Sequence, residues 1–138
     1  MATISLRAYI REIESLIDHN QTDAAIAHCM HILQFMPKHI GTYRMLGKAL
    51  HEAQRYADAA DVFQRVLTVV PDDFVANVGL SIIRQDEGNM DAAIWHMERA
   101  YETQPSNLPI QEELRRLHGR RDGLEPPRVR LTRGALAR

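Results

Sequence analysis

The fold is decided by residues 43–71, which read YRMLGKALHEAQRYADAADVFQRVLTVVP. Large apolar side chains recur in this stretch at intervals of three and four residues, the spacing that places them on one face of an α-helix. Gln54-Arg55 interrupts the pattern midway, and Pro71 ends it, because proline cannot continue a helix. The stretch therefore predicts two helices folded into a hairpin.

The same pattern recurs at a fixed interval along the chain, which indicates a repeat architecture. We call this interval, the one from Pro37 to Pro71 and from Pro71 to Pro105, one period. Asn20-Gln21 and Gly88-Asn89 supply the equivalent breaks, with residue types that tolerate the left-handed conformation that ends a helix. The other columns in register are Ala25, Ala59 and Ala93; and Cys29, Phe63 and Met97. Each period is predicted to be one helical hairpin, and stacked hairpins bury a continuous core.

This pattern resembles the tetratricopeptide repeat (TPR) family. The second period carries the family's positions most fully, with Tyr43, Leu46, Gly47, Leu50, Tyr56, Ala59, Phe63 and Pro71. The first period has Glu12-Ile13 in place of the Leu-Gly pair, and the third has Leu80-Ser81. The resemblance covers residues 6–107 and implies an all-α fold, a right-handed superhelical stack of three helix-turn-helix repeats.

We expect a TPR domain over residues 1–119, with repeats at about 6–39, 40–73 and 74–107. An amphipathic cap over 108–118, with Leu114 and Leu117 one turn apart, is placed to cover the last repeat. Residues 120–138 are interpreted as an Arg-rich linker and the start of a further helix. On this interpretation the chain is compatible with being a fragment of a longer repeat protein.

Composition points to a soluble, cytoplasmic protein. The 138 residues are 45% hydrophobic and 25% charged, and no apolar stretch approaches the roughly 18 residues that span a membrane. Residues 1–119 carry 11 basic and 16 acidic side chains, whereas residues 120–138 carry six arginines and two acidic side chains. The Arg-rich segment lacks interleaved aromatic residues, and the acidic body would repel phosphates, which argues against nucleic acid as a partner.

No motif in the sequence indicates an enzyme, a cofactor or a metal site. His51-Glu52-Ala53-Gln54-Arg55 begins like a helical zinc-protease motif but has Arg55 in place of the second histidine ligand. His28 and His31 are expected on the solvent-facing side of their helix, and Cys29 is expected to be a buried, unreactive thiol. The pairs Asp72-Asp73 and Glu112-Glu113 are expected at helix starts, where they favour the positive end of the helix dipole.

Function is therefore sought on surfaces, and first on the concave side, which the leading helix of each hairpin lines in repeat proteins. The family's clamp for C-terminal carboxylates uses Lys and Asn where this chain has Ile10 and Glu14, so that clamp is not supported. The predicted concave-face residues are Ile10, Glu14, Arg44, Lys48, His51, Val75, Val78 and Ile82. An alternative interpretation is that Val78 and Ile82 are buried by the cap or by a further repeat.

Trp95 is predicted to lie on the convex side, opposite Ala93 and Met97 on its helix. A bare indole is unusual, so we expect it either to stack with Arg99 one turn on, or to be covered by the C-terminal segment or another subunit.

Together these features predict a non-enzymatic protein-interaction module. It would bind a peptide or helix on its concave face, with apolar anchors on the third repeat and basic guidance from Arg44 and Lys48. The alternative is a structural spacer or self-association segment, with which a homo-oligomer is compatible.

Overall fold

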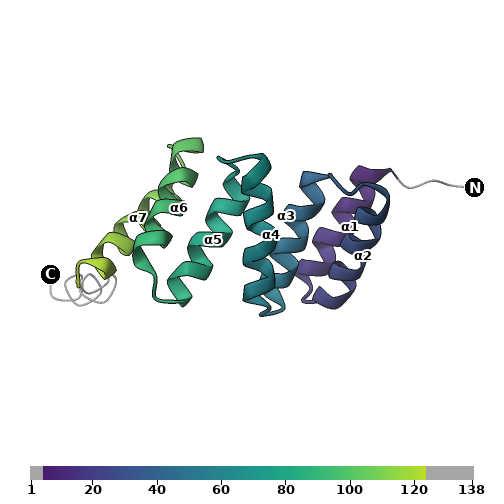
Figure 1. The fold of residues 1–138 in the computed structure, drawn as a ribbon, viewed down its shortest axis with the longest axis horizontal. Helices are drawn as coiled ribbons and strands as arrows, with labels where there is room; N and C mark the ends of the chain where they lie inside the picture. Colours follow the sequence, from purple (N-terminus) through teal and green to yellow (C-terminus); the bar gives the residue numbers. More distant parts are fainter. Residues whose placement is uncertain (1–4, 124–138) are drawn as a thin grey trace, which may run out of the picture. The chain divides into compact units, whose positions relative to one another are not determined.

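Residues 5–123 are described by the computed structural model, and within them the chain consists of seven α-helices with no strand (Figure 1). The helices are α1 (Leu6–Asp18), α2 (Thr22–Phe35), α3 (Ile40–Glu52), α4 (Tyr56–Val69), α5 (Phe74–Asp86), α6 (Met90–Thr103) and α7 (Leu108–Arg121). They form three hairpins followed by one further helix, so the predicted all-α class and capping helix are confirmed. None of the described helices is long and apolar enough to cross a membrane.

The chain divides into two compact units, and the single TPR domain expected over residues 1–119 stays a prediction. Unit 1 is Met1–Pro71 and contains the hairpins α1/α2 and α3/α4. Unit 2 is Asp72–Arg138 and contains the hairpin α5/α6 together with α7. The linker and further helix predicted for the C-terminal end fall largely in residues 124–138, outside the described residues.

The turn inside each hairpin is set by one residue in the left-handed conformation. Asn20, Gln54 and Gly88, each one period from the next, have φ angles of 61°, 63° and 80°. The backbone amide of the residue after each then donates a hydrogen bond to a carbonyl in the last turn of the preceding helix. Arg55 N–H, for example, donates to the Leu50 carbonyl at 2.8 Å. This geometry satisfies carbonyls at the helix end, and it confirms the predicted breaks.

A second column of residues starts the leading helices. Ser5, His39, Asp73 and Asn107 are also spaced by one period, and the side chain of each accepts a hydrogen bond from the amide three residues later. The prediction for Asp73 is therefore confirmed, whereas that for Glu112-Glu113 is wrong. These glutamates lie beyond the first turn of α7, which Asn107 begins, and Glu113 instead pairs with Arg116.

The same column identifies α7 as the leading helix of a fourth period. It begins one period after α5, and Leu114 follows Leu46 and Leu80 in the Leu column. The helix ends at Arg121, whereas the sequence analysis predicted that it would end at residue 118.

The two helices of a hairpin pack closely where one contributes a small residue. A Cβ added to Gly47 of α3 would lie 2.5 Å from the Phe63 ring of α4, so only glycine fits at this contact. At the equivalent position of α5, Ser81 is buried, and its hydroxyl donates to the Ala93 carbonyl of α6 at 2.7 Å. In α1 this position is Ile13, and a pocket of about 290 Å³ lies beside it, lined by Tyr9 and His28 among others.

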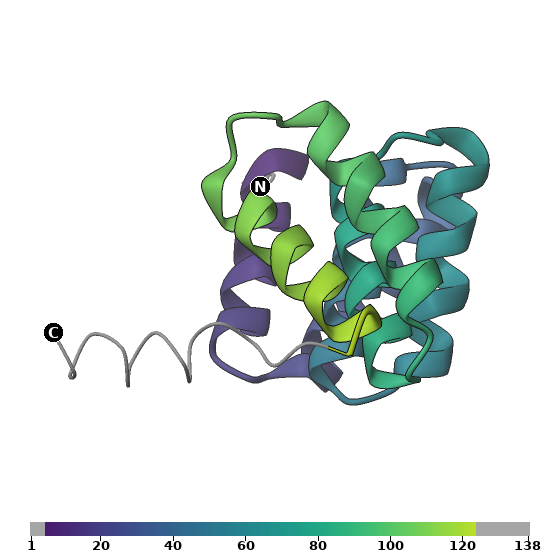
Figure 2. The same ribbon diagram turned by 90° about the vertical axis from the view of Figure 1, so that its left-hand side faces the viewer.

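Each unit has its own apolar core. In unit 1 the core includes Cys29, which is fully buried, and burial raises the pKa of its thiol to about 12. The predicted unreactive thiol therefore lies in the expected place. In unit 2, Ile110 and Leu117 of α7 join Met97 of α6 in one buried cluster, with Leu114 packed against it. Figure 2 shows α7 lying beside α6, which confirms its capping role.

The core of unit 2 also contains a hydrogen-bonded polar group. His96 is 8% exposed, and its Nδ1 lies 3.0 Å from the side-chain oxygen of Asn77, which can only accept. The Asn77 amide donates in turn to the Asp73 backbone carbonyl. Burial, together with the nearby positive charge of Arg84, lowers the pKa of His96, so this side chain is neutral near pH 7.

Acidification should therefore destabilise unit 2. The unfolded chain binds a proton at His96 as the pH falls through 6.5, the ordinary pKa, whereas the folded chain resists until its lowered pKa is reached. Stability should be greatest above this range and fall through it. Because Trp95 is the single tryptophan and lies on α6, its fluorescence reports thermal unfolding of this unit. The melting temperature should drop more in wild type than in His96→Gln between about pH 7.5 and about pH 5.5. An equal drop in both proteins would remove His96 as the cause.

Overpacking at the buried alanine column should destabilise unit 1. Ala59 is fully buried, so Ala59→Leu should cost about 1–3 kcal/mol of unfolding free energy, measured by urea denaturation. Ala57→Leu is the matched control, because Ala57 is exposed on the same helix. Equal stability of the two variants would contradict the assigned register.

Candidate functional site

The predicted concave-face residues fall into two sets, one in each unit. In unit 1, α1 carries half-buried Ile10 and exposed Glu14, and α3 carries half-buried Arg44 and exposed Lys48. His51 of α3 packs the edge of its ring on Tyr56 of α4, with the ring centres 5.2 Å apart. None of these five residues lines the pocket beside Ile13.

In unit 2, the predicted residues of α5 differ in burial. Val78 packs against the core cluster formed by α6 and α7, which favours the interpretation that the cap covers it. Val75 is half-buried, and Ile82 is 37% exposed. A binding role for these residues stays a prediction.

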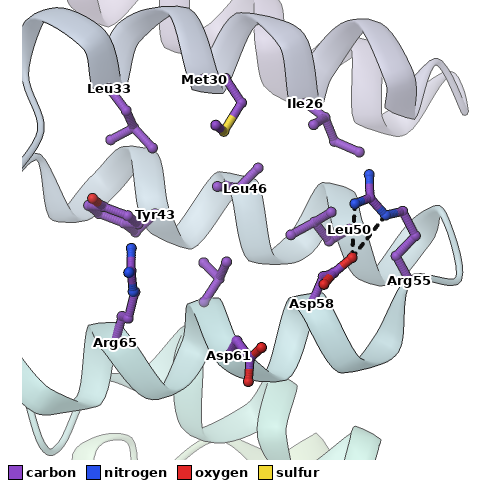
Figure 3. A pocket seen from close by; sticks show the side chains of 11 residues that line it. Ile26, Met30, Leu33, Tyr43, Leu46, Leu50, Arg55, Asp58, Asp61 and Arg65 are labelled. Carbon is purple, nitrogen blue, oxygen red and sulfur yellow. Dashed lines mark hydrogen bonds and ion pairs between the residues drawn. The ribbon is translucent and has the colours of Figure 1, made fainter.

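A groove that the sequence analysis did not identify lies in unit 1 between α2, α3 and α4 (Figure 3). We call it the unit-1 groove, and its volume is about 860 Å³. Its lining residues are Ile26, Met30 and Leu33 of α2; Tyr43, Leu46 and Leu50 of α3; Arg55, the N-cap residue of α4; and Asp58, Asp61, Val62 and Arg65 of α4. The side chains of α2 and α3 that line it are uncharged, and all the charged ones come from α4 and its N-cap.

The apolar side chains form successive layers along the groove. Figure 3 shows Leu33 facing Tyr43 at one end, Met30 above Leu46 in the middle, and Ile26 nearest Leu50 at the other end. Successive layers are three or four residues apart on each helix, which is about one turn or 5 Å. The groove therefore presents apolar contacts at the spacing of a helix.

The floor of the groove is buried, whereas one wall is open to solvent. Leu46 and Leu50 are each 5% exposed, but Met30 is 52% exposed. The equivalent residues one and two periods later are Gln64 and Glu98, both exposed polar residues. Met30 is therefore apolar at a surface position where the other two periods have polar residues. The flexible side chain of methionine can adapt its shape to a binding partner.

The signal for the groove was present in the sequence. Ile26, Met30 and Leu33 follow the helical period one position after the buried stripe Ala25, Cys29 and Ile32. A second apolar stripe beside the buried one widens the apolar face of α2 beyond what the partner helix covers.

The charges on α4 are unevenly satisfied. Arg55 binds Asp58 through two nitrogens, with Nη2 at 2.8 Å and Nε at 3.1 Å from Oδ2. Within residues 5–123, neither Asp61 nor Arg65 has a hydrogen-bond or ion-pair partner for its charged group. Figure 3 shows Arg65 directed toward Tyr43 and away from Asp61. The charges of Arg55 and Asp58 thus neutralise each other at one end of the groove, whereas Asp61 and Arg65 remain two separate charges along the rest of α4.

The two histidines of α2 lie on its exposed side, as predicted, and each contacts an aromatic ring. Tyr9 Oη lies 2.7 Å from His28 Nδ1, linking α1 to α2, and the His31 ring meets Phe35 with centres 5.1 Å apart. In the described part of the chain, no three His, Cys, Asp or Glu side chains gather closely enough to hold a metal ion.

Trp95 lies on the outward side of α6, as predicted, and is 51% exposed. The guanidinium carbon of Arg99 lies 5.2 Å from the centre of its ring, which is the stacking that the sequence suggested. The Arg99 Nε is buried without a hydrogen-bond partner, so the contact with the ring compensates part of its desolvation. Contact with the C-terminal segment falls outside the described residues.

Removing the cation from Trp95 should change both stability and fluorescence. Arg99→Gln should lower the unfolding free energy by about 0.5–1 kcal/mol and shift the emission of Trp95, because the charge over the ring is lost. Arg115→Gln on α7 is the control, since Arg115 is exposed and has no such ring contact. Emission that is identical in wild type and Arg99→Gln would contradict the stacked arrangement.

Comparisons with known proteins identify the fold alone. No protein-family model and no curated protein matches the chain. Among solved structures, a chain in the structure of Naa15/Naa10 bound to HypK-THB is similar, with a TM-score of 0.68 and 22% sequence identity. The match covers 79% of this chain and 16% of that chain. Naa15 is a TPR-containing protein, so the likeness supports a TPR-like arrangement of helical hairpins.

Proposed function

We propose that this chain is a non-enzymatic, cytoplasmic protein-interaction module whose unit-1 groove binds a helical segment of a protein partner. The observation that carries the proposal is the layered apolar lining, in which half-exposed Met30 lies over buried Leu46. An apolar surface that remains open to water gains free energy when a partner covers it.

The dimensions of the groove suit a helix. Ile26 and Leu33 are seven residues apart, which corresponds to roughly 10.5 Å along a helix axis. Two turns of a partner helix cover about the same length, so anchors at i, i+3 or i+4, and i+7 would meet the successive layers of the groove.

The structural neighbour is compatible with this function. It belongs to a complex, Naa15/Naa10 bound to HypK-THB, and this chain resembles 16% of one chain of it. A shared fold does not select a ligand, and it is the open apolar lining of the groove that favours binding.

The concave face is the second candidate binding surface. Ile82 favours it, because this side chain is 37% exposed on the leading helix of the third hairpin, where a peptide anchor was predicted. Self-association through either surface is the alternative to a separate partner, and the oligomeric state of the purified chain in sedimentation distinguishes them.

Binding in the groove should be lost when Met30 is made charged. Helical peptides that bind the full chain are selected from a display library, and their affinities are then measured for Met30→Asp. We expect about tenfold or more weaker binding, because Met30 borders the middle layer of the groove. The matched control is Gln34→Asp, at an exposed position of α2 that does not line the groove.

Two results would contradict this proposal. Selection could return no helical binder, or the selected peptides could bind Met30→Asp as tightly as wild type. In the second case Ile82→Asp tests the concave face, with circular dichroism confirming that each variant is folded.

A further inference from the structure

Resting on the proposed function, we infer that the partner helix carries a charged pair on the flank facing α4: a basic residue opposite Asp61 and an acidic residue one turn away opposite Arg65. The two walls of the unit-1 groove differ in chemistry. The wall from α2 is apolar, with Ile26, Met30 and Leu33, whereas the charged groups all lie on α4 or at its N-cap. A partner helix lying between them is therefore amphipathic across its width.

Two of the four charged side chains that line the groove, Arg55 at the N-cap of α4 and Asp58 within it, need no counter-charge from a partner. The guanidinium of Arg55 and the carboxylate of Asp58 already bind each other at 2.8 Å, so a neutral side chain can lie against them. This ion pair lies at the end of the groove formed by Ile26 and Leu50 (Figure 3).

The other two charges lack partners within residues 5–123. Asp61 and Arg65 are four residues apart on α4, which is one helical turn. Arg65 points toward Tyr43 in the end layer, and the Tyr43 hydroxyl donates to the Pro37 carbonyl. Asp61 lies closer to the middle of the groove. The positions to be matched are thus one turn apart and in different layers.

Docking makes these charges costly unless they are matched. A partner covering the groove removes water from Asp61 and Arg65, and an unpaired charge shielded from water loses solvation free energy. A counter-charge on the partner offsets that loss, whereas a like charge adds repulsion. Asp61 and Arg65 thus chiefly determine which helices bind. They disfavour helices whose apolar side chains fit the groove but whose charges do not complement those of α4.

Long-range attraction contributes little to this selection. Residues 1–71 carry seven basic and seven acidic side chains, so unit 1 has no net charge to draw a partner of one sign. The local arrangement of the pair decides which helix stays bound.

The experiment uses the full chain and four synthetic helical peptides with identical leucine anchors at i, i+4 and i+7. On the side that faces the groove they differ only at two flank positions one turn apart, which hold Lys/Glu, Glu/Lys, Glu/Glu or Lys/Lys. Compensating residues on the solvent-facing side give all four peptides the same net charge. Affinities are measured by fluorescence anisotropy for wild type, Asp61→Arg and Arg65→Glu, with Gln64→Glu as the control for an added charge on α4 outside the groove.

Wild type should bind one of the two mixed peptides about fivefold or more tightly than Glu/Glu and Lys/Lys. Asp61→Arg should prefer Glu/Glu, Arg65→Glu should prefer Lys/Lys, and Gln64→Glu should keep the wild-type preference. These preferences should fade in about 0.5 M salt. Met30→Asp is measured with the same peptides. If Met30→Asp weakens binding but the preference among the peptides is the same in all the other variants, the charge pairing is wrong and the groove function stands. If none of the peptides binds any variant, the groove function itself is overturned.

Discussion

The contact between Gly47 and the ring of Phe63 is the constraint on which unit 1 depends. Because the ring occupies the space where any larger side chain on α3 would lie, α4 packs against the α3 backbone itself. Close packing here sets how near the charged face of α4 comes to Leu46 and Leu50, which form the floor of the groove. The distance between α3 and α4, and with it the depth of the groove, thus depends on a glycine at position 47.

Local signals fix where each helix begins and ends, independently of that contact. The left-handed residue at position 54 closes the α3/α4 hairpin, and the side chain of His39 satisfies the first turn of α3 at 3.1 Å. Both devices recur once in every period, so each hairpin carries its own start and turn. Local and tertiary preferences agree, which is the consistency expected of a sequence that specifies one fold.

Most of the fold could be predicted from the sequence, because the period places Ala59 and its equivalents in buried positions that any close hairpin requires. The end of α7 and the division at Pro71 could not. Helix ends are set by capping residues. That Asn107 is an N-cap becomes evident only when it is compared with the N-caps one, two and three periods earlier. The candidate site was missed for a different reason. Periodicity identifies the buried face of α2, but only packing shows that Met30, next to it, remains uncovered.

Departures from the repeat, more than the repeat itself, point to function. Positions that match across the three periods are those that packing requires, so they carry no information about a partner. Met30 stands where the other periods have Gln64 and Glu98, and Trp95 stands where they have Ala27 and Asp61. Each is an apolar side chain at an exposed position, which stability does not demand. Trp95 is partly covered by Arg99 of its own helix, whereas Met30 borders an open groove with layered apolar contacts. Of these two side chains, Met30 is therefore the one that leaves an apolar surface open beside a groove, which is why a partner is proposed there.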